Sequence, residues 1–205
     1  LKRIIKIKSS FLVKLLSKFN LGRLFLEGLI EENNNLIKEV LCKDVSLKFY
    51  TPNNINLYRV ESFHYKEPET IDWIDSFKKN SVFWDIGSNI GLFSCYAARK
   101  NNCTVYSFEP SVFNLDILCK NINLNNLNEK ITVMPLPISD SIKHSKFRFS
   151  SLVKGGAIST FGEKFTYDGT KLKSIFEYVT TGISINEILK YFKFLKPDYL
   201  KIDVD

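Results

Sequence analysis

The sequence has few of the residues that hold metals or build disulfide frameworks. Its 205 residues include four cysteines and two histidines, and no two cysteines form a C-x-x-C pair. This inventory argues against a zinc site and against a disulfide framework, and it suits a reducing compartment such as the cytoplasm. We therefore expect no metal, and we interpret Cys42, Cys95, Cys103 and Cys119 as small buried hydrophobic residues.

Long apolar runs and the composition of disordered chains are also missing. No stretch approaches the about 20 apolar residues that a membrane-spanning helix needs. The N-terminal segment lacks the small-residue cleavage site of a signal peptide. Because 44% of the residues are hydrophobic and 25% are charged, a disordered or low-complexity chain is excluded. The length fits one ordinary domain with a short appendage.

Acidic residues are absent from the first 26 positions, which hold seven lysines and arginines. The remaining residues carry equal numbers of basic and acidic side chains, so the net charge of +7 lies in this segment. The neutral body argues against a nucleic-acid partner. Residues 1–26 are predicted to form one basic amphipathic helix, with Lys8 on its apolar face. Such a helix either makes peripheral contact with an anionic membrane or packs on its own domain.

The apolar pattern changes after residue 60 and becomes typical of alternating strands and helices. Strands are predicted at 81–86, 104–108 and 131–138, and helices at 90–100 and 112–125. Two β-α-β units in series indicate an α/β fold with a doubly wound, mostly parallel sheet.

The rest of the chain is predicted from weaker signals. Residues 140–180 are a polar insert of loops and antiparallel strands, and 184–194 form a helix that Ser184 and Glu187 cap. A fourth strand follows at 199–204, and we expect the sheet to be truncated there, because doubly wound sheets usually have more strands. We divide the chain into 1–60, a helix and lead-in with a strand or hairpin near 45–50, and 61–205, the α/β domain.

The informative motif follows the first predicted strand and reads D-x-G-x-N-x-G, from Asp85 to Gly91. A strand that runs through a glycine turn into a helix presents backbone N–H groups at the carboxyl edge of the sheet. The nicotinamide fingerprint G-x-G-x-x-G is absent, and Asp85 would repel a pyrophosphate. Glu109 ends the second strand, where an acidic residue commonly binds ribose hydroxyls. This combination indicates S-adenosylmethionine and disfavours an oxidoreductase.

Three segments together resemble the FkbM-type methyltransferase family. They are Phe83-Trp-Asp-Ile-Gly-Ser-Asn-Ile-Gly-Leu-Phe93, Val105-Tyr-Ser-Phe-Glu-Pro110 and Leu200-Lys-Ile-Asp-Val-Asp205. The resemblance covers about residues 60–205 and implies a class I, Rossmann-like fold. It further implies S-adenosylmethionine as the methyl donor and O-methylation of a glycan or another small molecule.

The resemblance also implies roles for individual residues. Those expected to bind the cofactor are Glu69, Thr70, Asp85, Gly87, Ser88, Asn89, Gly91, Glu109 and Pro110. Asp203 and Asp205 would lie near the transferred methyl group and are the candidate catalytic bases. The alternative is a non-catalytic Rossmann-like module that binds a ligand or a partner without turnover.

Overall fold

A computed structural model describes residues 2–33 and 35–204 of the chain. Contacts between residues divide the chain into two units, Leu1–Ile37 and Lys38–Asp205. Residues 38–60, which the sequence analysis grouped with the N-terminal segment, thus belong to the larger unit.

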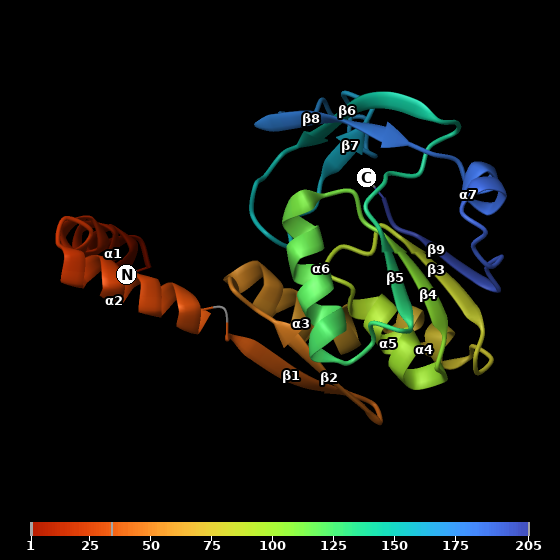
Figure 1. Ribbon diagram of the computed structural model, residues 1–205, viewed down its shortest axis with the longest axis horizontal. Helices are drawn as coiled ribbons and strands as arrows, with labels where there is room; N and C mark the ends of the chain where they lie inside the picture. The colour runs from red at the N-terminus through yellow and green to blue at the C-terminus, as the bar shows by residue number, and fades with distance from the viewer. Residues whose placement is uncertain (1, 34, 205) are drawn as a thin grey trace. The chain divides into compact units, whose positions relative to one another are not determined.

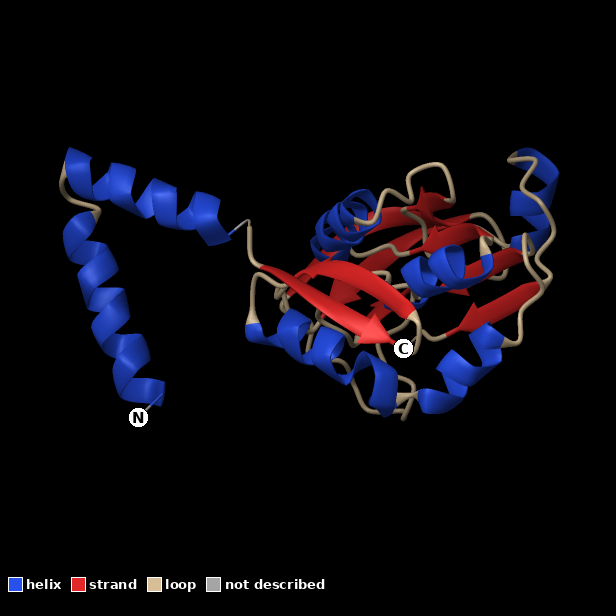
Figure 2. Ribbon diagram, turned by 90° about the horizontal axis from the view of Figure 1, so that it is seen from below, coloured by secondary structure: helices blue, strands red, loops and turns tan. Residues whose placement is uncertain are grey.

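The N-terminal unit contains two helices, α1 (Lys2–Leu16) and α2 (Asn20–Asn33), where the sequence predicted one helix over 1–26 (Figure 2). The chain turns at Ser17, whose hydroxyl donates to the carbonyl of Lys14 (3.0 Å). The Arg23 side chain donates to the carbonyl of Ser17 (2.9 Å), so side chains satisfy carbonyls that a continuous helix would use. Within residues 2–33 and 35–204, none of the helices combines the length and the hydrophobicity that a membrane span requires.

The larger unit is built on a four-stranded parallel sheet (Figure 1). Its strands are β3 (Val82–Ile86), β4 (Thr104–Phe108), β5 (Ile131–Met134) and β9 (Tyr199–Ile202), in the order β5-β4-β3-β9. Helices α5 (Leu92–Asn101) and α6 (Val112–Leu124) connect β3 to β4 and β4 to β5. The predicted α/β fold with a parallel sheet is confirmed.

The third strand is shorter than predicted, because it ends at Met134 and not at residue 138. Pro135 and Pro137 follow, and neither has an N–H to donate to a neighbouring strand. The chain therefore leaves the sheet at the edge where the cavity described below opens.

Residues 37–75 carry structure that the sequence analysis largely missed. The hairpin of β1 (Ile37–Cys42) and β2 (Val45–Tyr50) agrees with the strand predicted near 45–50. Helices α3 (Asn54–Lys66) and α4 (Pro68–Asp75) were not predicted. Asn53 caps α3 by accepting from the N–H groups of Ile55 and Asn56.

The insert between β5 and β9 forms a second sheet, as the sequence indicated. Its strands are β6 (Lys143–Phe149), β7 (Ser159–Phe161) and β8 (Phe176–Gly182), antiparallel in the order β7-β6-β8. Helix α7 (Ile185–Tyr191) follows with the predicted capping box of Ser184 and Glu187. In Figure 1 this second sheet lies beyond the carboxyl ends of the parallel strands.

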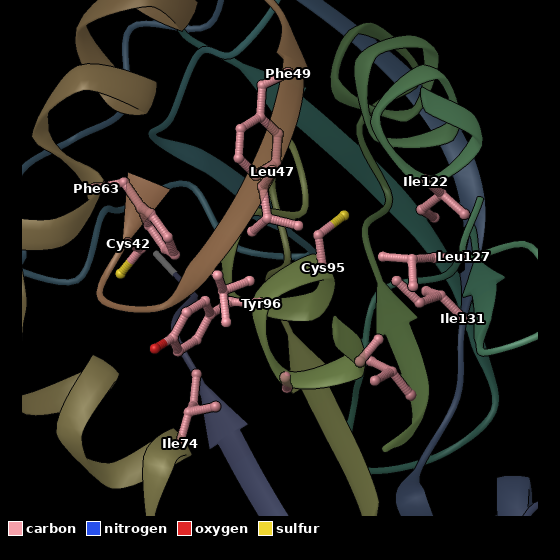
Figure 3. Packing of buried hydrophobic residues seen from close by; sticks show 14 of the residues in the cluster. Cys42, Leu47, Phe49, Phe63, Ile74, Cys95, Tyr96, Ile122, Leu127 and Ile131 are labelled. Atoms are coloured by element: carbon pink, nitrogen blue, oxygen red, sulfur yellow. The ribbon is translucent and has the colours of Figure 1, made fainter. Parts of the chain in front are cut away.

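Both faces of the parallel sheet are buried, as parallel sheets require. On one face Phe83 and Val105 belong to a large core that includes Leu47, Phe49 and Tyr96, whose packing Figure 3 shows. On the other face Trp84, Tyr106 and Phe108 pack with Ile188 of α7. With its faces covered, the sheet offers its carboxyl edge to a ligand.

Candidate functional site

A cavity of about 430 Å³ opens at the carboxyl ends of the parallel strands. Its wall includes residues that follow β3, β4, β5 and β9, and residues of the second sheet: Gly87, Asn89, Glu109, Pro110, Leu136, Pro137, Phe147, Phe161 and Asp203 among them. This volume lies within the about 300–1,000 Å³ typical of small-molecule sites. The cavity is therefore large enough for a nucleoside-sized ligand.

The backbone of the loop after β3 packs directly against the backbone at the end of β9. A Cβ atom on Gly87 would lie 2.0 Å from the carbonyl oxygen of Asp203, and its φ is +83°. Gly91 has a φ of +81°, and a Cβ there would lie 2.4 Å from the Leu118 side chain. At Gly87 any larger residue would displace backbone, and at Gly91 the positive φ favours glycine and a Cβ would displace the Leu118 side chain. The two glycines of the motif thus bring the loop to the cavity wall.

Glu109 joins this loop to the end of β4. It is 5% exposed, and its Oε2 accepts from the Asn89 N–H while its Oε1 accepts from the Ser111 N–H, both at 2.8 Å. Burial raises the pKa of Glu109 to about 7, although both N–H groups favour the ionised form. Each oxygen keeps acceptor capacity beyond its one N–H bond.

Asp85 lies behind the loop. The described residues that line the two cavities do not include it. Its Oδ2 accepts from the Ser94 hydroxyl at 2.6 Å, and its buried Oδ1 has no hydrogen-bond partner in the described part of the chain. Burial raises the pKa of Asp85, against the attraction of Lys201 on the adjacent strand. Asp85 is thus placed to hold the loop and α5 together from inside.

Ser88 lines a smaller cavity of about 60 Å³ that shares Gly87, Asn89 and Asp203 with the larger one. Within the described residues, the buried Ser88 Oγ and Asn89 Oδ1 have no hydrogen-bond partner. Buried polar atoms without partners are uncommon in folded proteins, and the two residues that carry them here line cavity walls. Both residues are therefore candidates for contact with a polar ligand.

The remaining predicted site residues are distributed unevenly. Asp203 lines both cavities, and its Oδ2 pairs with Lys201 Nζ at 2.8 Å. Glu69 is exposed in the first turn of α4 and Thr70 is half-buried, whereas Glu67, just before that helix, lines both cavities. Asp205 lies outside the described residues.

Sequence reasoning missed three further parts of the cavity wall. Arg59 and Lys66 come from α3, which was not predicted, so no signal placed them there. Asn114 follows Glu109 by five residues on α6, and its position after the predicted ribose-binding residue could have identified it. The segment 156–159 belongs to the insert, and its place in the wall depends on tertiary contacts.

The site is organised for a polar organic ligand. Across residues 2–33 and 35–204, His, Cys, Asp and Glu form no group of three that could hold a metal ion. The wall combines a buried carboxylate, backbone N–H groups and apolar side chains, as small-molecule sites do.

Comparisons with known proteins agree with this geometry. A family model described as "Methyltransferase FkbM domain" matches residues 85–205. The hexuronic acid methyltransferase AglP of Haloferax volcanii is 28% identical over 133 residues, which are 64% of this chain and 48% of AglP. The methyltransferase sdnD of Sordaria araneosa is 34% identical over 82 residues, which are 38% of this chain and 32% of sdnD. The chain thus spans about half of AglP and about a third of sdnD.

Among solved structures, the chain is similar to TYW2 of M. jannaschii, determined in complex with AdoMet. The TM-score is 0.37 and the identity 20%, over 48% of this chain and 42% of TYW2.

Proposed function

The chain belongs to the FkbM methyltransferase family, and we propose that it methylates a hydroxyl group of a glycan or another small molecule with S-adenosylmethionine as donor. Bound in the cavity, this cofactor would supply an electrophilic methyl group on a sulfonium centre. The observation that carries the proposal is Glu109, a buried carboxylate that lines the cavity and bonds the backbone of the glycine loop.

The residues of the site fit that cofactor. Glu109 can accept from two ribose hydroxyls with the lone pairs that the two N–H groups leave open. Ser88 Oγ and Asn89 Oδ1 offer unpartnered polar atoms to the rest of the ligand. A dinucleotide would bring its pyrophosphate to the glycine loop, directly in front of the buried Asp85, and two acidic groups so close together are unfavourable. Gly87, Gly91, Asp85 and Pro110 would shape the loop and the wall.

Methyl transfer from a sulfonium to a hydroxyl needs close alignment and a base. Asp203 lies in the wall of both cavities and is our candidate base, with Asp205 as the second candidate. Lys201 pairs with Asp203 at 2.8 Å and so helps to fix its carboxylate in the wall. Glu69 and Thr70 remain proposed contacts at the closing edge of the site.

We propose a glycan as the acceptor, because AglP is named for methylation of a hexuronic acid. Arg59 and Lys66 in the cavity wall place positive charge where an acidic sugar would be held. The formal neutrality of residues 27–205 argues against a nucleic-acid acceptor.

We further propose that the protein acts in the cytoplasm, with peripheral membrane contact through residues 1–26. The four cysteines are free thiols, as a reducing compartment favours. Cys42, Cys95 and Cys103 are buried, but Cys119 is exposed, so the prediction that all four are buried is wrong for Cys119. The N-terminal unit exposes large apolar side chains beside its basic ones: Phe11, Leu12, Leu15, Phe19, Leu21, Leu24 and Phe25.

The proposed cofactor predicts a clear binding preference. S-adenosylmethionine and S-adenosylhomocysteine should bind to the chain in titration calorimetry, whereas NAD should give no binding heat. Binding of NAD without a response to S-adenosylhomocysteine would exclude the proposal. Binding without methyl transfer to any of a panel of hydroxylated and uronic-acid glycans would favour the non-catalytic module instead.

The pH dependence of binding should follow Glu109. Its pKa of about 7 means that the carboxyl group is protonated in the ligand-free protein below that pH. Ribose hydroxyls bond best to the ionised group, so binding releases a proton there, and the affinity for S-adenosylhomocysteine should fall by up to about tenfold per pH unit below 7. Calorimetry between about pH 5.5 and 8.5, a range that spans the pKa of Glu109, measures the change in affinity.

A matched variant identifies the titrating group. Burial also raises the pKa of Asp85, so both acids change affinity in the same direction. Glu109→Gln should bind more weakly and lose the dependence, and an unchanged pH profile in this variant would assign it to Asp85.

A further inference from the structure

A short segment of the insert is hydrogen-bonded to helices α3 and α6 and to the glycine loop after β3. Residues 154–156, which we call the strap, lie between β6 and β7. On one side, the amides of Asn53 and Asn56 donate to the carbonyl of Lys154, at 3.0 and 3.1 Å. The Arg59 side chain donates to the carbonyl of Gly155 at 2.8 Å. Helix α3 and its cap therefore hold the outer side of the strap.

The inner side of the strap is held by two asparagines of the site. Asn89 Nδ2 and Asn114 Nδ2 both donate to the carbonyl of Gly156, at 3.0 and 3.2 Å. The N–H of Gly155 in turn donates to Asn114 Oδ1 at 3.0 Å. Asn114 thus bonds the strap as donor and as acceptor, the pairing that a side-chain amide uses to fix a backbone segment.

Asn114 also acts on Glu109. It is 5% exposed, it lines the cavity, and its side-chain amide lowers the pKa of Glu109. Asn89 makes the parallel connection, because its own N–H donates to Glu109 Oε2. The carboxylate and the strap therefore share the same two asparagines.

The strap continues directly into the cavity wall, which includes residues 156–159. Ile158 has a φ of +63°, a region that β-branched residues rarely adopt. Such strain persists only where surrounding contacts hold the backbone, and it concentrates at functional sites. Gly155, with a φ of +80°, cannot be replaced freely, since a Cβ would lie 2.1 Å from Asn56 Oδ1.

We infer that Asn114 is a positioning residue, which holds the strap against Glu109 and thereby fixes the wall of residues 156–159 around the bound nucleoside. The inference rests on the proposed function for its ligand, S-adenosylmethionine. The insert thus takes part in cofactor binding. Both the rigidity of the strap and the affinity for the cofactor depend on the Asn114 side chain.

Amide hydrogen exchange and calorimetry on the full chain test this inference. In Asn114→Ala, without ligand, the Gly155 amide should exchange about tenfold faster than in the wild type, because its acceptor is gone. S-adenosylhomocysteine should bind about tenfold more weakly. Asn123→Ala is the matched control, since Asn123 is an exposed asparagine on the same helix. It should leave both quantities unchanged.

Asn114→Asp keeps an acceptor for Gly155 and places a second carboxylate beside Glu109. The pH midpoint of S-adenosylhomocysteine binding should therefore move upward, a change that a merely structural residue would not cause. The other ionisable groups near Glu109 are Asp85, Tyr178 and the cavity residues Arg59, Lys66, Glu67 and Asp203, which the variant leaves in place.

Two results would overturn the inference. Unchanged exchange at Gly155 in Asn114→Ala would show that Asn114 does not hold the strap. Faster exchange with wild-type affinity and an unmoved midpoint would show that the strap does not support the site. If the wild type itself fails to bind S-adenosylhomocysteine, the proposed function fails, whereas the exchange result still judges the contact between Asn114 and the strap.

Discussion

Replacing Glu109 with alanine should weaken the binding of S-adenosylhomocysteine by about 10²–10⁴-fold. The carboxylate is expected to accept from two ribose hydroxyls, and a hydrogen bond to a charged group contributes about 1.5–3 kcal/mol. Each 1.4 kcal/mol changes the dissociation constant about tenfold. Calorimetry at pH 8, about one unit above the pKa of Glu109, measures the change with the carboxylate ionised.

The same substitution also removes the acceptor of two backbone N–H groups, those of Asn89 and Ser111. A second variant, Glu109→Gln, keeps one acceptor and the side-chain volume, so its loss of affinity should be smaller. Glu129→Ala, at an exposed position, controls for a general effect of losing a carboxylate. Thermal unfolding of each variant separates loss of binding from loss of the fold. Wild-type affinity in a folded Glu109→Ala protein would contradict the assigned role.

The parallel sheet could be predicted because its signals are local. The strand at 104–108 was predicted with its observed bounds, since Thr104–Phe108 is a short apolar run closed by Glu109-Pro110. The sequences of helices α3 and α4 predict helix only weakly. Asn53, which caps α3, is equally typical of a loop. The break between α1 and α2 depends on side-chain contacts across the turn, such as that of Arg23 with Ser17.

The part of the site that the glycine motif and the end of β4 form could be predicted from the sequence. Gly87, Asn89 and Glu109 meet at one edge because carboxyl ends of adjacent parallel strands do so in every such sheet. Asp85 belongs to the same motif, yet it faces Ser94 behind the loop, because its position in the strand directs it to the α5 face. Asn114 and the strap come together only through the fold of the insert, which no local pattern specifies.

Reversing three charges of the N-terminal unit should strongly weaken the proposed binding to anionic vesicles. Lys8, Lys14 and Lys18 are exposed, and each basic residue near an anionic surface contributes about 1 kcal/mol. Exchanging all three for glutamate should therefore weaken partition onto vesicles of phosphatidylserine and phosphatidylcholine by at least about 100-fold. The exposed apolar side chains of α1 and α2 would add burial at the interface once the helices are bound.

Co-sedimentation at low and high salt measures this partition, and the wild type should dissociate as salt rises, because screening weakens the attraction. The matched control reverses three exposed lysines of the larger unit, Lys78, Lys79 and Lys196, and should bind as the wild type does. The comparison separates a local basic surface from net charge, since both variants change the charge equally. If both variants sediment like the wild type, residues 1–26 do not contact the membrane, and the alternative is that they pack on the protein itself. In that case the charge reversal should leave vesicle binding unchanged. Deletion of residues 1–26 should then lower the free energy of unfolding of the remaining chain.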